Sequence, residues 1–234
     1  MISIITPVLN GADFIEKNIK SISKLSIPFE HIIVDGGSTD GTIEILNSFS
    51  HLKIIHQKDN NGMYGAIHLG FEIALYDYIT WVNSDDLIFN NNFEFAVAYA
   101  YSNSIDFVYG DGLFNWSLKS KKTFHKANPF AKYFLRKGIL PFLQPSSFYS
   151  KKIYGNIKLR FHIFKIAGDL DFFMQIAKQK GLKFWYCRKP MTEFLKYGES
   201  LGDRNHLLYL KEKKKLYKEP NLFHLILFKL TQKF

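Results

Sequence analysis

The residues best suited to chemistry are two adjacent carboxylates that follow an uncharged stretch of the chain. Residues 78–82 carry no charge, and only Asn83 and Ser84 separate them from Asp85 and Asp86. Such a stretch is typical of a strand buried on both faces, where unpaired anions carry a large desolvation cost. We therefore predict a strand that ends at Asn83, with both carboxylates beyond its carboxyl end, where ligands bind in open α/β sheets.

Paired carboxylates at such a position suit a hard divalent cation. Mg²⁺ and Mn²⁺ prefer oxygen ligands and are usually held by one or two carboxylates together with substrate phosphates. Asp85 and Asp86 thus predict a metal that bridges the protein to a diphosphate. Asp is also favoured at helix N-termini, so this stretch alone leaves both interpretations open.

The elements around this pair alternate between strands and helices. Strands are predicted at residues 2–6, stopped by Pro7, and at 30–35, 52–56 and 107–110, with helices at 14–25, 43–49, 66–74 and 90–102. This order favours βαβ units and a parallel sheet. Right-handed crossovers would place Asp35, Asp59 and the Asp85–Asp86 pair along one edge of that sheet.

A glycine-rich loop, residues 36–42, follows the strand that ends at Asp35. Glycines such as Gly37 let the backbone approach a ligand closely, and Ser38 or Thr39 could cap the next helix. The loop matches neither the Walker motif nor the dinucleotide fingerprint. An ordinary structural turn therefore remains an alternative.

Charge separates the two halves of the 234-residue chain. There are 5 Lys and Arg against 14 Asp and Glu up to Leu118, and 26 against 7 from Lys119 onward. The basic half suggests an anionic ligand or surface, with nucleic acid, anionic lipid, a phosphorylated acceptor or a solvated face left open. The single cysteine, Cys187, excludes an internal disulfide and indicates a reduced, cytoplasmic setting. No apolar run approaches the ~20 residues of a membrane span.

The second half of the chain predicts a hairpin over residues 114–124, strands at 147–149 and 183–186, and a helix that begins at Gly168 and Asp169. A charged helix over 202–217 and an apolar segment over 222–234 follow. Lysines in the first and apolar residues in the second would suit an interfacial membrane segment. A helix packed on the domain, or an oligomer contact, is the alternative.

Four motifs in this order resemble the family-two glycosyltransferases of GT-A fold, in the branch that builds bacterial cell-surface polysaccharide. They are residues 4–10 (IITPVLN), 34–42 (VDGGSTDGT), 83–86 (NSDD) and 168–171 (GDLD). The resemblance covers residues 1–200 and implies a Rossmann-like, mostly parallel sheet flanked by helices. Residues 201–234 would then be a basic, amphipathic C-terminal helical segment.

The resemblance also implies an inverting, metal-assisted transfer of a sugar from a nucleoside diphosphate sugar, with a UDP-sugar expected, to a glycan or lipid-linked acceptor. Asp169 would be the catalytic base and Asp86, with Asp85, the ligand of Mn²⁺ or Mg²⁺. The residues implied to border the donor or acceptor are Pro7, Leu9, Asn10, Asp35, Gly37, Asp59, Gly62, Tyr64, Asp85, Gln144 and Ser200.

Some positions depart from the family pattern. Gly168 replaces the usual Glu before the base, and Asn83 replaces an Asp seen in many relatives. Asp171, two residues after the base, is interpreted as structural. A sugar-phosphate nucleotidyltransferase is the first alternative, and a nucleic-acid binder that uses the basic half is the second. We predict no nucleic-acid partner, and a cytoplasmic enzyme that is free or peripheral on the inner face of the membrane.

Overall fold

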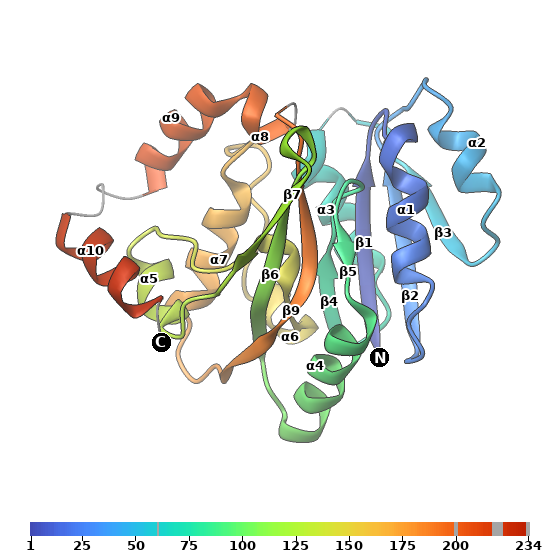
Figure 1. The fold of residues 1–234 in the computed structure, drawn as a ribbon. Coiled ribbons are helices and arrows are strands. Elements are labelled where there is room, and N and C mark those ends of the chain that lie inside the picture. The colour runs from blue at the N-terminus through green and yellow to red at the C-terminus, as the bar shows by residue number, and fades with distance from the viewer. Residues whose placement is uncertain (60, 199–200, 217–221, 233–234) are drawn as a thin grey trace.

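Strands and helices alternate along the first half of the chain in the computed structural model, as predicted (Figure 1). It describes residues 1–59, 61–198, 201–216 and 222–232. Within these ranges one nine-stranded sheet runs in the order β3-β2-β1-β4-β8-β6-β9-β5, and β7 pairs with β6. The strands are β1 (Ile2–Val8), β2 (Phe29–Asp35), β3 (Leu52–His56), β4 (Tyr78–Trp81), β5 (Leu87–Ile88), β6 (Phe107–Trp116), β7 (Lys121–His125), β8 (Ser147–Ser150) and β9 (Phe184–Lys196).

Helices cover both faces of this sheet. They are α1 (Ala12–Ile22), α2 (Thr42–Asn47), α3 (Gly62–Ile73), α4 (Asn90–Asn103), α5 (Ala131–Arg136), α6 (Lys151–Tyr154), α7 (Gly168–Lys178), α8 (Leu201–Arg204), α9 (His206–Leu216) and α10 (Leu222–Thr231). One core joins the sheet to α3, α5, α6 and α7, while α1, α2 and α4 pack in two further clusters. In β1, Ile5 belongs to the first core and Ile4 to the α4 cluster, so this strand is buried on both faces, as expected of a central parallel strand.

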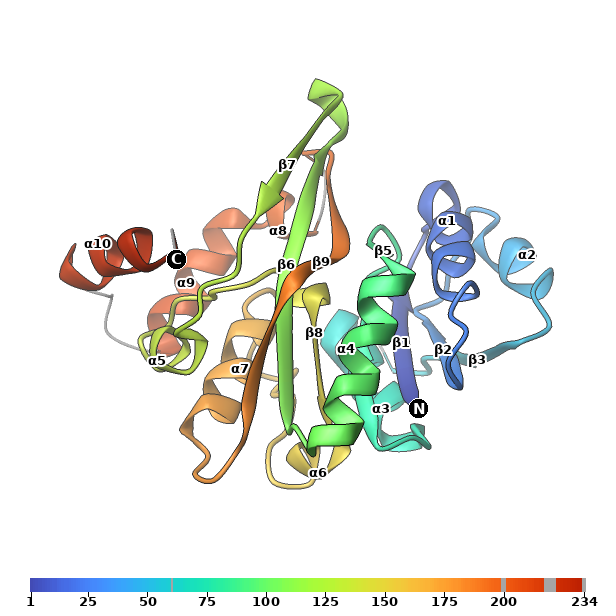
Figure 2. The same cartoon turned by 60° about the horizontal axis from the view of Figure 1, so that its bottom comes forward.

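The predicted fold class is confirmed, and its parallel part is well defined. β3, β2, β1 and β4 pair in parallel, as do β6 and β9. β8 lies antiparallel between β4 and β6. The β6–β7 hairpin forms as predicted and extends beyond the sheet, whereas α4 lies across one face (Figure 2).

Several predicted boundaries were wrong. β1 continues through Pro7. Its pairing with β4 has already ended at Ile5↔Trp81, so on the β4 side no ladder partner needs the N–H that Pro7 lacks. β4 ends at Trp81 rather than Asn83, and α3 begins at Gly62 rather than at residue 66.

The strands of the second half are longer than their sequence pattern suggests. β6 extends to Trp116 and β9 to Lys196, because the two strands pair along their whole length around an irregularity near Asp111. The two-residue strand β5 was not predicted. The expected helix over 202–217 forms as two helices, α8 and α9, within the described residues.

The C-terminal helices α9 and α10 both contact the rest of the domain. The Glu212 carboxylate of α9 accepts hydrogen bonds from the backbone of residues 165–167. In α10, the Phe228 ring packs edge-on against Phe134 at 5.0 Å, and its carbonyl accepts a hydrogen bond from the Asn128 amide. Among the described residues, no helix combines the length and the apolar character that crossing a membrane requires.

Candidate active site

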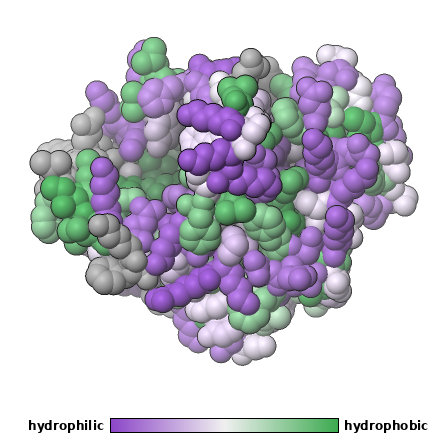
Figure 3. Space-filling model, in the orientation of Figure 1, coloured by the Kyte–Doolittle hydropathy of each residue, from purple (hydrophilic) through white to green (hydrophobic). Residues whose placement is uncertain are grey.

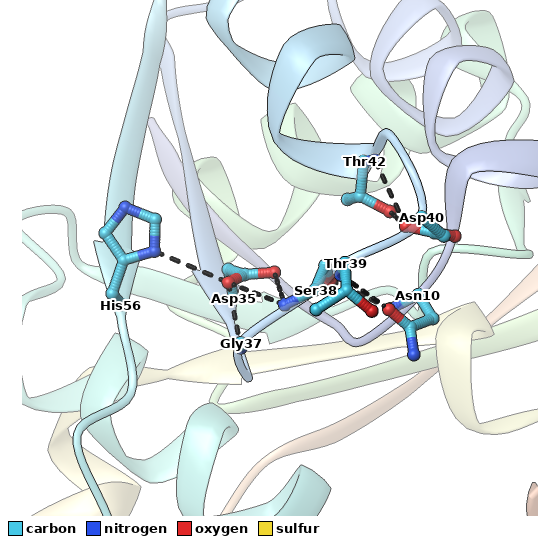
Figure 4. A network of polar contacts seen from close by, with 8 residues as sticks. All are labelled: Asn10, Asp35, Gly37, Ser38, Thr39, Asp40, Thr42 and His56. Carbon is cyan, nitrogen blue, oxygen red and sulfur yellow. Dashed lines mark hydrogen bonds and ion pairs between the residues drawn. The ribbon is translucent and has the colours of Figure 1, made fainter.

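The carboxylate of Asp35, at the end of β2, organises the glycine-rich loop (Figure 4). It accepts hydrogen bonds from the backbone N–H groups of Gly37 at 2.9 Å and Ser38 at 3.2 Å, and the His56 ring nitrogen lies at 3.4 Å. Gly37 has a φ of 96°, which is unstrained only for glycine. Burial alone would raise the pKa of Asp35, but together these hydrogen bonds lower it by more than burial raises it. The pKa of Asp35 therefore lies below its ordinary value. An ionised carboxylate is therefore fixed at the sheet edge.

Asn10 joins this loop to the end of β1. Its backbone N–H donates to the Ser38 hydroxyl at 2.8 Å, and its side-chain oxygen accepts from the Thr39 N–H at 2.9 Å (Figure 4). Leu9 is 62% exposed although it is apolar, and it lies beside Gly36. Pro7 is buried inside β1. The ends of β1 and β2 thus present an apolar side chain next to a fixed anion.

Asp85 and Asp86 lie in a turn after β4 that is held by a buried amide. The Asn18 side chain of α1 donates to the carbonyls of Asn83 at 3.0 Å and Asp86 at 2.8 Å. The backbone N–H of Leu195, near the end of β9, donates to the Asp86 carboxylate at 3.2 Å. Two elements that are distant in the sequence, α1 and β9, therefore fix this turn at the carboxyl end of β4.

The two carboxylates of the turn are electrostatically unfavourable. Burial raises the pKa of Asp86 well above its ordinary value, and the neighbouring charge of Asp85 raises it further. The pKa of Asp85 is raised mainly by burial, and the charge of Asp203 adds to this, against a hydrogen bond from Tyr197 and the charge of Lys196 that lower it. Desolvation is the main cause for both carboxyl groups, and repulsion from a neighbouring carboxylate adds to it.

This donor set fits a hard divalent cation. Two adjacent carboxylates, whose ionised forms repel each other, gain most from a bound cation, and phosphate and water oxygens can complete its coordination. No cluster of three or more His, Cys, Asp or Glu that could hold a metal lies within the described ranges. The prediction of a cation shared with a diphosphate therefore depends on Asp85 and Asp86.

Asp169 lies in the first turn of α7, and α7 packs against the end of β4. The Phe173 ring stacks on Trp81, the last residue of β4, at 5.6 Å, and Phe172 meets the same indole edge-on at 5.8 Å. Burial raises the pKa of Asp169 to about 6, although hydrogen bonds from Leu170 and Tyr64 act to lower it. The aromatic contacts thus place a carboxyl group with a raised pKa on the helix that packs against the strand leading to Asp85 and Asp86.

Tyr64 of α3 contacts the same turn and explains the unusual Gly168. Its single hydroxyl proton is shared between the Ile166 carbonyl, at 3.0 Å, and the Asp169 carboxylate. A Cβ atom at Gly168 would lie only 2.7 Å from the Tyr64 ring. The Glu that is usual at this position would therefore displace Tyr64, and glycine allows the aromatic ring to pack beside Asp169.

Asp171 is structural, as interpreted from the sequence. The Arg160 guanidinium binds both of its oxygens, and the Gln175 amide donates to it at 3.0 Å. A buried carboxylate satisfied in this way has little capacity left to accept a substrate proton. Asp169 and Asp171 thus differ in environment although they are two residues apart.

The remaining predicted residues have varied surroundings. Gln144 is buried and its amide donates to the Trp81 carbonyl at 2.8 Å, at the end of β4. Asp59 is exposed, and Gly62 begins α3 with a φ of 68°. Ser200 lies outside the described residues. The sequence analysis missed Asn18, Leu195 and Tyr197, since an Asn inside a helix and residues of a late strand carry no motif.

The fold and this site define a class of protein. S. aureus TarS 1–349 superposes with a TM-score of 0.69 at 20% identity, covering 94% of this chain and 67% of that one. The mannosyltransferase PcManGT from Pyrobaculum calidifontis, in complex with GDP-Man and Mn²⁺, has a TM-score of 0.64 at 17% identity, with coverages of 98% and 68%. TarS 1–349 has also been solved with UDP-GlcNAc. The chain has the GT-A glycosyltransferase fold.

Curated relatives agree with that class. An uncharacterized glycosyltransferase of Haemophilus influenzae is 34% identical over 119 residues, which are 49% of this chain and 48% of the relative, so the match spans about half the relative's length. A PGL/p-HBAD biosynthesis glycosyltransferase of Mycobacterium bovis is 26% identical over 210 residues, 85% of this chain and 78% of the relative. The family model for glycosyl transferase family 2 matches residues 3–158. The chain belongs to glycosyl transferase family 2.

Proposed function

We propose that this protein transfers a sugar, with inversion, from a nucleoside diphosphate sugar to a hydroxyl group of a glycan or lipid-linked acceptor. The observation that carries the proposal is that three carboxyl groups with raised pKa values belong to segments that follow the end of β4 or pack against it. Asp85 and Asp86 follow that strand directly, and the helix that bears Asp169 stacks on its last residue, Trp81. Family membership supports the reaction class.

The donor would lie along the carboxyl ends of β1, β2 and β4. Pro7, Leu9, Asn10, Asp35 and Gly37 would bind the nucleoside, because they combine an apolar surface with a fixed anion that can accept hydrogen bonds from it. Because TarS has been solved with UDP and with UDP-GlcNAc, a UDP-sugar is our first candidate donor. Gln144 would border the acceptor. Asp59, Gly62, Tyr64 and Ser200 would border the sugar nucleotide.

Asp86, with Asp85, would hold Mn²⁺ or Mg²⁺. The cation would supply Lewis-acid stabilisation of the leaving diphosphate. The two carboxylates would orient the cation and the leaving group through their fixed place in the turn held by Asn18. Their burial and mutual repulsion would favour the binding of a cation.

Asp169 would act as the general base. The acceptor oxygen attacks the anomeric carbon and its proton passes to the Asp169 carboxylate, while the bond to the diphosphate oxygen breaks and the nucleoside diphosphate leaves with the electron pair. A pKa of about 6 keeps most of this carboxylate ionised at pH 7 and makes it a stronger base than an ordinary Asp. No carboxylate nucleophile is needed, unlike in a retaining glycosidase.

The C-terminal segment would bind an anionic membrane surface that carries the acceptor. In α10 the apolar side chains of Phe223, Ile226 and Leu230 are exposed, and hydrophobic surface gathers there, at the left of Figure 3. In α9 the lysines Lys211, Lys214 and Lys215 are exposed. Apolar residues beside lysines suit the boundary between headgroups and acyl chains. We expect the protein to float with vesicles rich in phosphatidylglycerol. It should not float with phosphatidylcholine vesicles, or in about 1 M salt, where a Debye length of about 3 Å screens the surface charges. Equal flotation in all three conditions would contradict this binding mode.

A nucleotide screen tests the proposed reaction. We expect UDP, UDP-GlcNAc, GDP or GDP-mannose to raise the melting temperature only when Mn²⁺ is present, and the stabilising nucleotide sugar to be hydrolysed slowly by water. Asp86→Ala should abolish the effect of Mn²⁺ on nucleotide binding. Failure of every nucleotide to bind, or unchanged affinity of Asp86→Ala in Mn²⁺, would count against the proposal.

A further inference from the structure

The segment that leads into Asp169 is held by a carboxylate from a distant part of the chain. Glu212 of α9 accepts hydrogen bonds from the backbone N–H groups of Lys165 at 2.8 Å, Ile166 at 2.9 Å and Ala167 at 2.9 Å. Its side chain is only 3% exposed. These three N–H groups belong to the residues just before α7, so one side chain fixes the whole entry to the helix that carries the base.

The contact is unusual for the helix that provides it. Glu212 is the buried residue of α9, whereas Leu207 and Leu210 of the same helix are exposed. α9 is therefore attached to the domain by a charged group. If the contact served only to stabilise the fold, an apolar side chain at this position would be sufficient. A buried carboxylate is tolerated only when its oxygens are paired, and the start of a helix is where N–H groups and the helix dipole favour an anion.

A second side chain holds the same segment from another element. The Tyr64 hydroxyl of α3 donates to the carbonyl of Ile166, whose N–H is bound by Glu212. The Tyr64 ring packs where Gly168 lacks a side chain. Ile166, three residues before Asp169, is thus fixed on both sides. Glu212 of α9 binds its N–H, and Tyr64 of α3 binds its carbonyl.

We infer that Glu212 is a positioning residue for the Asp169 carboxylate, so that the C-terminal segment forms part of the catalytic apparatus. This inference rests on the proposed role of Asp169 as the base. Proton transfer requires the base within hydrogen-bond reach of the acceptor oxygen, and a displacement of about 1 Å can cost roughly 100-fold in rate. Within the described residues, Glu212 hydrogen-bonds to the backbone of residues 165–167 and not to the donor site at β1, β2 and β4, so the affinity of that site for nucleotide should not depend on α9.

The test compares Glu212→Leu and Glu212→Gln with Glu44→Gln, an exposed Glu on α2. The readout is hydrolysis of the nucleotide sugar that the thermal screen identifies, with Mn²⁺ and with water as acceptor. We expect Glu212→Leu to lower kcat roughly 10- to 100-fold at unchanged nucleotide Kd. Glu212→Gln, which keeps one acceptor oxygen, should restore part of that rate, and Glu44→Gln should match the wild type.

Folding and catalysis are separated by two further measurements. Circular dichroism checks that each variant is folded, and Glu212→Gln replaces Glu212→Leu if the latter does not fold. In the Asp169→Asn background, Glu212→Leu should cause no additional loss of kcat, because both changes act on one group. Wild-type kcat in folded Glu212 variants, a rise in nucleotide Kd equal to the loss of rate, or additive losses in the double variant would each overturn the inference.

These outcomes are distinct from a failure of the proposed function. If the wild-type protein neither binds nor hydrolyses any nucleotide sugar, the transferase proposal fails before Glu212 is changed. If Asp169→Asn keeps full turnover, Asp169 is not the base and the inference about Glu212 fails with that role, while nucleotide binding at Asp85 and Asp86 is unaffected.

Discussion

Two groups of carboxylates in the candidate active site differ in how far hydrogen bonds stabilise their charge. Asp35 accepts backbone hydrogen bonds from its own loop and has a lowered pKa. Asp85, Asp86 and Asp169 have raised pKa values, chiefly because of burial. The comparison teaches that position alone does not assign a role. We call a carboxylate satisfied when its hydrogen bonds outweigh its burial, and unsatisfied when burial outweighs its hydrogen bonds. A satisfied carboxylate serves as a rigid part of a binding surface, whereas an unsatisfied one is stabilised when it binds a cation or a proton.

The largest expected effect tests the unsatisfied group. Asp169→Asn should lower turnover roughly 10²- to 10⁴-fold, the range typical of general-base catalysis, because the amide cannot accept the acceptor proton. Nucleotide affinity in Mn²⁺ should stay at the wild-type value. The measurement is single-turnover hydrolysis of the donor together with calorimetric nucleotide binding. Asp171→Asn is the matched comparison, and turnover that is retained in Asp169→Asn but lost in Asp171→Asn would reverse the two assignments.

The next effect tests the satisfied group. Asp35→Ala removes the acceptor for the Gly37 and Ser38 N–H groups, and each lost hydrogen bond of this kind costs about 1–3 kcal/mol. We expect the nucleotide Kd to rise roughly 10- to 100-fold, with kcat at saturating donor little changed. A titration of UDP in Mn²⁺ measures this. A variant that binds UDP normally but turns over slowly would place Asp35 in the unsatisfied group.

A smaller effect separates the groups by stability. Asp86→Asn removes one of the two repelling charges, and the Asn83 amide, which donates to the Asp86 carboxylate at 3.5 Å, can donate equally to the new amide oxygen. Because the pKa of Asp86 is raised on folding, its ionised form destabilises the protein at neutral pH but not below the ordinary pKa of Asp.

Metal-free Asp86→Asn should therefore be more stable than the wild type at pH 7, by about 1 kcal/mol, or about 2–4 °C in Tm. The gain should vanish near pH 3, and Mn²⁺ should no longer stabilise the variant. Calorimetry at the two pH values, with and without Mn²⁺, measures this. A lower Tm at pH 7 would show that the pair is satisfied without a cation.

The smallest expected effect is a shift in pH dependence. The rate of donor hydrolysis should rise with pH through a midpoint of about 6, since only the ionised Asp169 can accept a proton. The hydrogen bond from Tyr64 acts to lower this pKa. Tyr64→Phe should therefore move the midpoint to higher pH. Rate profiles between about pH 4.5 and about pH 8.5 test this. A midpoint that moves to lower pH would exclude Tyr64 as the donor to Asp169.

The elements of the first half follow closely from the sequence. The strands at 30–35 and 52–56 and the helix at 90–102 are found within a residue or two of their predicted bounds, and in the second half the helix expected to begin at Gly168 does so. These segments have a strong apolar period and polar residues at their ends, so local physical chemistry defines them. The late strand β9 was underestimated, because Arg188, Lys189 and Pro190 interrupt its apolar pattern and pairing with β6 and β5 keeps it extended.

The sequence by itself determined which residues are able to do chemistry: carboxylates placed after apolar strands, and glycines placed where the backbone turns. Only the tertiary structure decided how each of these groups is supported. Asn18, Leu195, Tyr64 and Glu212 reach the site across sequence separations of 45 to 109 residues. The reason is physical, because hydrogen bonds that fix a charged group depend on the packing of whole elements and leave no periodic mark in the sequence.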